Sequence, residues 1–233
     1  MNNYKVIAMI PARLGSKRIP KKNIRYLLDK PLIQYPIELA IQCERFDSIW
    51  VNTESEELGK ASQKLGANFH KRPEELATDT ATNREFTYEF MQKHKCDYVV
   101  MINATSPLLK LETLNAFLDY VDSNCYDTIV SVIKQKEETF YQGEPLNFSL
   151  EEKVNSQLLE PTEAICWALT AWKRDNFMKM QESGINPVYG GVIGRFSVPK
   201  NESCDLDTLE DWKIAEGMLM AERILTDERY MDI

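Results

Sequence analysis

Residues 6–25 of the chain read VIAMIPARLGSKRIPKKNIR. Residues 6–10 are apolar at every position, a pattern typical of a strand buried on both faces of a parallel sheet. The segment that follows carries six Lys and Arg side chains within residues 13–25 and a single glycine, Gly15. Cations and backbone N–H groups at the end of a strand bind phosphate oxygens, and open α/β sheets bind ligands at this edge. We therefore interpret residues 10–25, the basic loop, as a polyphosphate site rather than a solvated turn.

The basic loop is neither a Walker A motif nor a Gly-x-Gly-x-x-Gly turn. Pro11 and Pro20 stiffen it, so its positive charge comes from side chains more than from exposed backbone. Such a loop suits a triphosphate whose leaving group is pyrophosphate. We expect Arg13, Lys17 and Lys22 to be the cations that neutralise this group.

Composition limits the classes of function. The 233 residues suffice for one large domain, and no apolar run approaches the roughly 18 residues of a membrane span. The N-terminus leads directly into the first strand, so we expect no signal peptide. A formal net charge of −8 argues against nucleic-acid binding. Five scattered cysteines and two histidines argue against zinc or disulfides. We expect a cytoplasmic protein that binds neither membrane nor nucleic acid, with room for an oxygen-ligated metal.

Strand and helix patterns alternate along most of the chain. The expected strands are residues 6–10, 48–51, 68–70, 98–102, 128–133, 166–172 and 192–198. The expected helices are residues 32–43, 56–65, 82–94, 111–121 and 208–223. This alternation predicts an α/β fold with a mainly parallel sheet that helices cover on both faces. Residues 134–165 are polar and acidic, and we interpret them as an arm inserted into the single domain 1–233.

Two carboxylates lie two residues apart near the C-terminus, at Asp205 and Asp207. In an extended segment they point to the same side, where they repel each other unless a cation joins them. Magnesium together with a phosphate is the natural partner. In the alternative interpretation, Asp207 or Thr208 caps the following helix and Glu210 completes a capping box. The two roles are compatible.

Polar loops follow two further expected strands. Residues 71–82 come after the third strand, and residues 103–108 come after the strand at 98–102. Loops at this edge of a sheet usually build a ligand site. In the alternative interpretation the first of them is a surface loop, and Asp79 or Thr80 caps the next helix. The amide and hydroxyl groups of the second loop are suited to contact a substrate.

Together these segments resemble the acylneuraminate cytidylyltransferase family, which activates sialic acids and related nine-carbon acids with CTP. The basic loop matches I-P-A-R-x-G-S-K-R-I-P-x-K-N-I, and R-P-x-x-L-A-x-D-T-A stands at residues 72–81. T-S-P-L stands at residues 105–108 and D-x-D-T at residues 205–208. The resemblance covers residues 5–216. It implies an enzyme with a Rossmann-like, three-layer nucleotidyltransferase fold, the substrate CTP, Mg²⁺ as cofactor, and a homodimer formed through the arm at 134–165.

The resemblance also assigns roles to matching positions. The residues expected to bind the nucleotide are Ala12, Arg13, Gly15, Ser16, Lys22, Asn23, Arg72, Thr82 and Asn83. The residues expected to act on the leaving group are Arg13, Lys17 and Lys22, and those expected to hold magnesium are Asp205 and Asp207. From the residues themselves, and not from the resemblance, we expect a small-molecule acceptor to be faced by Asn103, Thr105, Ser106 and Trp167. For Trp167, and for the neighbouring Trp172, a place in the core is the alternative.

The chain departs from the family pattern on the acceptor side. Sialate enzymes show Q-P-T-S-P-L-R, whereas residues 103–109 read NATSPLL. They also show R-x-N-G-A-I-Y, whereas the stretch 163–172 lacks the Arg and the Asn-Gly pair and contains Trp167. We therefore expect cytidylyl transfer, in surface or capsular polysaccharide biosynthesis, to an acceptor other than a standard sialic acid, such as the phosphorylated acceptor L-glutamine phosphate. Three alternatives stay open: a CMP-nonulosonic acid synthetase, a nucleotidyltransferase for another base or a sugar 1-phosphate, and a non-catalytic nucleotide-binding relative.

Overall fold

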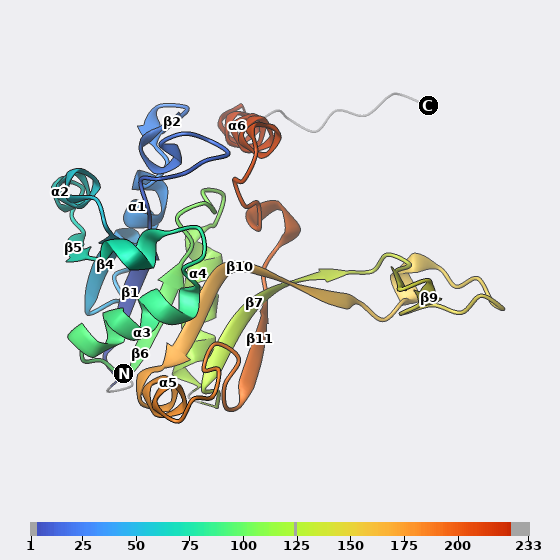
Figure 1. Ribbon diagram of the computed structural model, residues 1–233. Coiled ribbons are helices and arrows are strands. Elements are labelled where there is room, and N and C mark those ends of the chain that lie inside the picture. Colours follow the sequence, from blue (N-terminus) through green and yellow to red (C-terminus); the bar gives the residue numbers. More distant parts are fainter. Residues whose placement is uncertain (1–3, 124, 225–233) are drawn as a thin grey trace.

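The structure, a computed structural model, describes residues 4–123 and 125–224. Its centre is a seven-stranded sheet in the order β11-β7-β10-β6-β1-β4-β5 (Figure 1). Strand β10 runs antiparallel to both of its neighbours, and the other neighbouring pairs of the sheet are parallel. The strands are β1 (Val6–Pro11), β4 (Ser48–Thr53), β5 (Asn68–Lys71), β6 (Tyr98–Ile102), β7 (Thr128–Gln135), β10 (Thr162–Lys173) and β11 (Ile193–Ser197).

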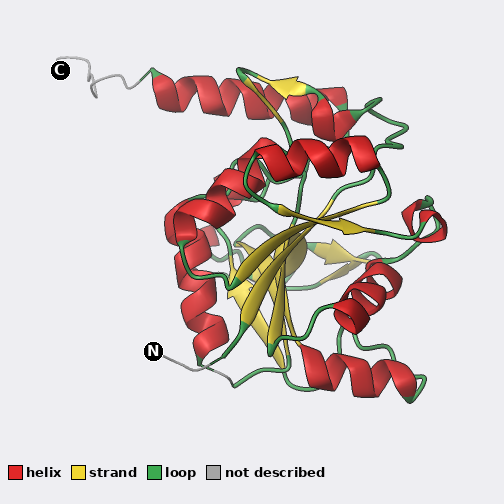
Figure 2. Ribbon diagram, turned by 90° about the vertical axis from the view of Figure 1, so that its left-hand side faces the viewer, coloured by secondary structure: helices red, strands yellow, loops and turns green. Residues whose placement is uncertain are grey.

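Helices cover both faces of this sheet (Figure 2). These helices are α1 (Gln34–Cys43), α2 (Glu56–Lys64), α3 (Asn83–Lys93), α4 (Leu111–Asp122) and α5 (Arg174–Glu182). A further helix, α6 (Leu209–Arg223), lies away from the sheet, at the top of Figure 1. Val6, Ala8 and Ile10 pack into the core beneath α1 and α4, whereas Ile7 and Met9 pack into the core beneath α3 and α5. Alternate residues of β1 thus fill two cores. The predicted three-layer α/β fold is confirmed.

Strands β7 and β10 run beyond the sheet as a two-stranded ribbon that carries an arm (Figure 1). The arm contains the short pair β8 (Phe140–Tyr141) and β9 (Glu144–Pro145), and one turn of 3₁₀ helix, η3 (Ser156–Leu158). The ribbon still pairs Gln135 with Thr162. The part between the two ribbon strands therefore spans residues 136–161, inside the expected arm of 134–165.

Several local features differ from the sequence-based expectations. Helix α5 was not expected, because among its residues only Phe177 is buried and its apolar pattern is weak. Thr208 caps α6, but Asp211 completes the capping box, since the box needs the third helical residue and Glu210 is the second. Thr82 with Glu85 caps α3 in the same way, in place of the expected Asp79 or Thr80. No helix of the described residues is long and apolar enough to cross a membrane.

Two short strands extend the basic loop. They are β2 (Tyr26–Leu27) and β3 (Lys30–Pro31), which pair as a small hairpin after the 3₁₀ turn η1 (Lys22–Ile24). Ile19 and Leu27 are buried with Leu206 and Trp212 in a third, separate core. This core joins the basic loop to the segment before α6, so the first and last parts of the described chain meet above the sheet.

Candidate active site

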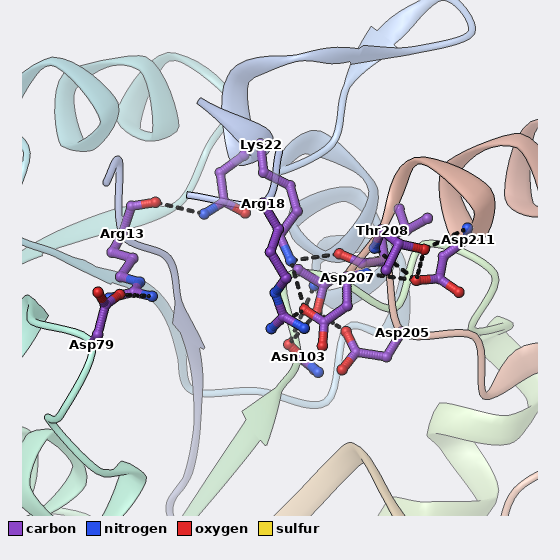
Figure 3. A network of polar contacts seen from close by, with 12 residues as sticks. Arg13, Arg18, Lys22, Asp79, Asn103, Asp205, Asp207, Thr208 and Asp211 are labelled. Carbon is purple, nitrogen blue, oxygen red and sulfur yellow. Dashed lines mark hydrogen bonds and ion pairs between the residues drawn. The ribbon is translucent and has the colours of Figure 1, made fainter. Parts of the chain in front are cut away.

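A cavity of about 170 Å³ lies where the basic loop, the residues after β6 and the segment before α6 meet (Figure 3). It is lined by Pro11, Arg13, Ser16, Lys17, Arg18, Ile19, Lys22, Asn23, Ala104, Thr105 and Asp207. We call it the basic cavity. The structure thus brings the three expected leaving-group cations together with Thr105 and Asp207. Arg18 was not among the expected site residues, although it was one of the six cations that identified the loop.

The basic loop is held by its own backbone and by the sheet. The Asn23 side chain is buried, and its Nδ2 donates to the Arg13 carbonyl over 2.8 Å. The Ala12 N–H donates to the Asn52 carbonyl over 3.0 Å, and Ala12 is buried. Gly15 lies on the loop outside the cavity lining, and a Cβ added there would meet no protein atom within 4 Å. The fold therefore fixes the loop at its base and leaves open space at Gly15.

Two aspartates neutralise the cations of the cavity (Figure 3). Asp79 pairs with Arg13 over 2.8 Å and also pairs with Lys17. Asp207 Oδ1 pairs with Arg18 over 3.0 Å and with Lys22 over 3.3 Å. The Nζ of Lys22 also donates to the backbone carbonyl of residue 206. Hydrogen bonds from Lys17 and then from Arg13 lower the pKa of Asp79, so this carboxylate is ionised at neutral pH.

Of the expected magnesium pair, Asp207 lines the same cavity, whereas Asp205 is outside its lining. The Asp207 N–H donates to the Asp205 carbonyl over 3.0 Å, so the segment makes a tight turn and is not extended. The Thr105 hydroxyl donates to the Asp205 carboxylate. Loss of hydration raises the pKa of Asp205, and the charge of Asp207 raises it further. No group of three or more ligating side chains occurs in the described residues. The two carboxylates suit Mg²⁺, which typically takes one or two protein carboxylates and completes its shell with phosphate and water.

A second cavity, of about 270 Å³, shares Pro11 and Arg13 with the basic cavity and reaches Arg72. The buried Arg72 donates from Nε to Asn52 Oδ1 over 2.8 Å and from NH2 to the Asn52 carbonyl over 2.7 Å. Its guanidinium lies 4.3 Å from the ring centroid of Phe86. Burial lowers the pKa of Arg72 to about 10. Sequence reasoning missed Asn52 and Phe86, although Asn52 directly follows the expected strand 48–51.

A third cavity, of about 610 Å³, lies between the start of α3, the end of α5 and the bend of β10. It is lined by Thr80, Thr82, Asn83, Arg84, Glu85, Trp167, Gln181, Asn186, Val188 and Tyr189. Thr82 and Asn83 therefore face this cavity rather than the one that Arg72 lines. Arg84, Gln181 and Tyr189 were not expected from sequence, because the chain has no motif around them.

Trp167 has an unusual backbone. Its φ is 58°, in the left-handed region that bulky residues rarely adopt. It sits where the register of β10 against β7 shifts, between Ile165 and Thr170. The ring centroids of Trp167 and Tyr189 are 5.9 Å apart. A strained residue beside a cavity is a recurrent feature of ligand sites. Trp172, in contrast, is fully buried and belongs to the core.

The four expected acceptor residues do not form one group. Thr105 lines the basic cavity, and Trp167 lines the third. Asn103 Oδ1 accepts from the Thr105 backbone N–H over 3.2 Å, and the Asn103 N–H donates to the Ala168 carbonyl over 3.0 Å. Ser106 is buried, lines none of the three cavities, and its hydroxyl has no partner in the described residues. Asn103 thus links the loop after β6 both to Asp205, through Thr105, and to the bend of β10.

Two relatives of this chain carry the word cytidylyltransferase in their names. N-acylneuraminate cytidylyltransferase A of Danio rerio is 30% identical over 220 residues, which are 92% of this chain and 51% of that protein. The chain thus spans about half the length of this relative. Pseudaminic acid cytidylyltransferase of Campylobacter jejuni is 29% identical over 230 residues, 91% of this chain and 95% of that protein.

Solved structures and a family model extend the comparison. CMP:2-keto-3-deoxy-manno-octonic acid synthetase, solved with CTP, superposes with a TM-score of 0.67 at 19% identity, and the match covers 94% of this chain and 100% of that one. At this identity it supports the fold alone. Residues 7–197 match the family model described as Cytidylyltransferase. The chain therefore belongs to the cytidylyltransferase family of enzymes.

Proposed function

We propose that the protein transfers CMP from CTP to a small-molecule acceptor and releases pyrophosphate. The basic cavity is the observation that carries this proposal. Arg13, Lys17, Arg18 and Lys22 line one small cavity at the edge of the sheet where parallel α/β folds bind ligands. A triphosphate is the common metabolite group whose charge matches such a set of cations.

In the proposed reaction, an acceptor oxygen attacks the α-phosphorus of CTP. The bond from this phosphorus to the oxygen bridging the β-phosphate breaks, and pyrophosphate leaves with the electron pair. Transfer of this kind needs positioning and charge neutralisation more than covalent catalysis. Arg13, Lys17 and Lys22 neutralise the charge that grows on the leaving group. A phosphate acceptor is already ionised at neutral pH, whereas a hydroxyl acceptor must lose its proton to a base.

Asp205 and Asp207 are the residues that we propose to hold Mg²⁺. When bound, the ion neutralises phosphate oxygens and aligns them. The chain prepares this position in two ways. Thr105 orients the Asp205 carboxylate, and Lys22 with Arg18 orients that of Asp207. Contacts to the phosphates draw these two cations away from Asp207, which leaves the carboxylate available for the metal.

The cavity around Arg72 is the proposed base site. Arg72 uses Nε and NH2 on Asn52, which leaves NH1 to donate to an acceptor such as the cytosine carbonyl. The stacking of its guanidinium on Phe86 holds this group in one plane. Thr82 and Asn83 line the third cavity instead, where they can contact the sugar or the acceptor. A base site of this kind predicts a larger thermal shift with CTP than with UTP, GTP or ATP.

The third cavity is the proposed acceptor site. Trp167 and Tyr189 form an aromatic wall, and the Nε of Arg84 is held by Gln181. A fixed guanidinium beside amide side chains favours an anionic acceptor, such as a phosphorylated molecule of the kind represented by L-glutamine phosphate. A nonulosonic acid is the second candidate, and the full-length match to the pseudaminic acid enzyme favours it. The CMP derivative of either acceptor is proposed to serve in surface or capsular polysaccharide biosynthesis.

The arm is the proposed dimer contact. It exposes large apolar side chains far from the sheet, namely Phe140, Tyr141, Leu146, Leu150 and Leu158. A projecting segment with this much exposed apolar surface is typical of an interaction site. A second copy of the chain is the proposed partner, which makes the enzyme a homodimer.

Pyrophosphate release tests the proposed function. The protein is incubated with CTP and Mg²⁺ against sialic, legionaminic and pseudaminic acids, 3-deoxy-manno-octulosonate, sugar 1-phosphates and L-glutamine phosphate. Release with any of these excludes a non-catalytic relative. Release only with phosphorylated acceptors supports the Arg84 site, whereas release with a nonulosonic acid supports the second candidate. Lys22→Met is the negative control. No release with any acceptor would contradict the proposed transfer.

A further inference from the structure

Asp79 has no role in the proposed reaction, yet it contacts two of the three cations that are proposed to neutralise the leaving group. Its carboxylate pairs with Arg13 over 2.8 Å (Figure 3) and also with Lys17. Arg13 lines both the basic cavity and the Arg72 cavity, and Asp79 lines the second of these. The carboxylate therefore sits at the junction of the proposed phosphate and base sites, with one cation on each oxygen.

These pairs are accessible to solvent. The side chains of Arg13, Lys17 and Asp79 are 33%, 81% and 42% exposed. Exposed pairs of this kind are weak and exchange readily, with net contributions of about 0–1 kcal/mol. A carboxylate and a phosphate accept the same donors from Arg and Lys. A polyphosphate that takes Arg13 and Lys17 therefore replaces Asp79 on both cations.

We propose that Asp79 is a positioning residue that holds Arg13 and Lys17 as a built-in competitor of the CTP triphosphate. The inference rests on the proposed function for the identity of the ligand. Asp79 costs any anion that takes the two cations a modest amount of binding free energy. A triphosphate, which can also contact Arg18 and Lys22, still binds, whereas inorganic phosphate, which can contact fewer of these cations, is left with weak binding.

The exchange also acts on the neighbouring loop. Asp79 lies within residues 78–81, a turn held by a hydrogen bond from the Ala81 N–H to the Thr78 hydroxyl over 3.2 Å. Thr80, in the same turn, lines the third cavity, and Ala81 lines the Arg72 cavity. When the phosphates take the two cations, this turn loses its tie to the basic loop. The arrival of the triphosphate is thereby communicated to the proposed base and acceptor sites.

The test measures polyphosphate binding without chemistry. Dissociation constants of inorganic phosphate, pyrophosphate and tripolyphosphate are measured by calorimetry, in EDTA, for the wild type, Asp79→Asn and Glu74→Gln. Glu74 is the matched control, because it precedes the same turn, is exposed and has no ion pair in the described part of the chain. Removing one negative charge close to the two cations strengthens tripolyphosphate binding about five- to tenfold at low salt.

We expect Asp79→Asn to bind tripolyphosphate and pyrophosphate more tightly by this factor and to gain measurable affinity for phosphate. The gain in tripolyphosphate affinity shrinks at high salt. The affinity of Glu74→Gln stays within about twofold of that of the wild type. Asp79→Glu, which keeps the negative charge, has the affinity of the wild type. In turnover assays Asp79→Asn lowers the KM for CTP, and kcat does not rise with it.

Weaker tripolyphosphate binding in Asp79→Asn overturns the inference, because Asp79 then helps to place the cations for the ligand. Unchanged binding also overturns it, because Asp79 then has no effect on the ligand. The titrations are repeated with Mg²⁺ in place of EDTA. A loss of binding in Asp79→Asn that appears only with Mg²⁺ also overturns the inference, since Asp79 is then a metal ligand. The proposed function fails separately, when tripolyphosphate binds as expected but no acceptor releases pyrophosphate from CTP.

Discussion

Replacing Lys22 by methionine tests whether the basic loop and the C-terminal segment are tied together through one ammonium group. The Lys22 side chain is only 13% exposed, and its Nζ contacts both Asp207 Oδ1, at 3.3 Å, and the carbonyl of Leu206. Methionine keeps the length and the apolar contacts of the stem while it removes the charge. Asp207 retains Arg18 as a partner, so the loss falls mainly on the Leu206 carbonyl.

The size of the effect follows from these contacts. A hydrogen bond to a charged group contributes about 1.5–3 kcal/mol. Because Asp207 keeps one partner and is 38% exposed, we expect the lower end of this range, about 1.5 kcal/mol. For a chain of this length, each kcal/mol shifts Tm by about 2–4 °C, so Tm falls by about 3–6 °C.

Thermal unfolding of Lys22→Met, with Lys21→Met as the control, measures this fall in Tm. Lys21 is the neighbouring residue, carries the same charge, is exposed and lies outside the cavity lining. We expect Lys21→Met to stay within about 1 °C of the wild type, as surface substitutions usually do. Added CTP should raise the Tm of Lys21→Met but not that of Lys22→Met. Equal melting temperatures of the two variants would refute the tie.

Three further outcomes are expected. Asp207→Asn should lower kcat/KM about 10- to 100-fold and make turnover insensitive to Mg²⁺, which a magnesium titration checks; a normal magnesium dependence would contradict the metal role. Leu158→Asp on the arm should convert a dimer into a monomer of unchanged circular dichroism, as light scattering reports; a persisting dimer would place the contact elsewhere. Burial lowers the pKa of His94 to about 4 and also lowers that of its partner His70, whereas unfolded histidine titrates near 6.5. Stability should therefore be full above about pH 6.5 and fall as the pH drops towards 4, and His94→Gln should flatten the decline of Tm over this range.

The sequence predicted the fold best at the central strands, which are buried on both faces of the sheet. Residues 6–10 and 98–102 predicted central strands because every residue of such a strand is covered, and the structure has β1 and β6 there. Helix α5 escaped notice because one buried residue, Phe177, anchors it. The bulge at Trp167 was also unpredictable, since its positive φ is imposed by the pairing of β10 with two different strands.

The candidate site was predictable only in part. The cations were visible because they are adjacent in sequence, whereas their carboxylate partners come from distant loops. Asp207 lies 185 residues from Lys22, and no local pattern indicates that pairing. Asn52 holds Arg72 because β4 and β5 pair in a register that sets Asn52 beside His70, two residues before Arg72. Long-range register is a property of the folded sheet and not of either segment.

The place of β7 in the sheet has a consequence for how the chain is made. Its two neighbours are β10 and β11, and both are synthesised after the arm. Strand β7 ends at residue 135, but its first partner strand is finished only at residue 173. During synthesis, the growing sheet therefore ends at β6 on one side. Strand β7, which is apolar, has already been made but has no neighbouring strand on either edge. The ribosome must deliver the whole arm before β10 enters between β6 and β7, and this interval is when the nascent chain is most exposed to mispairing.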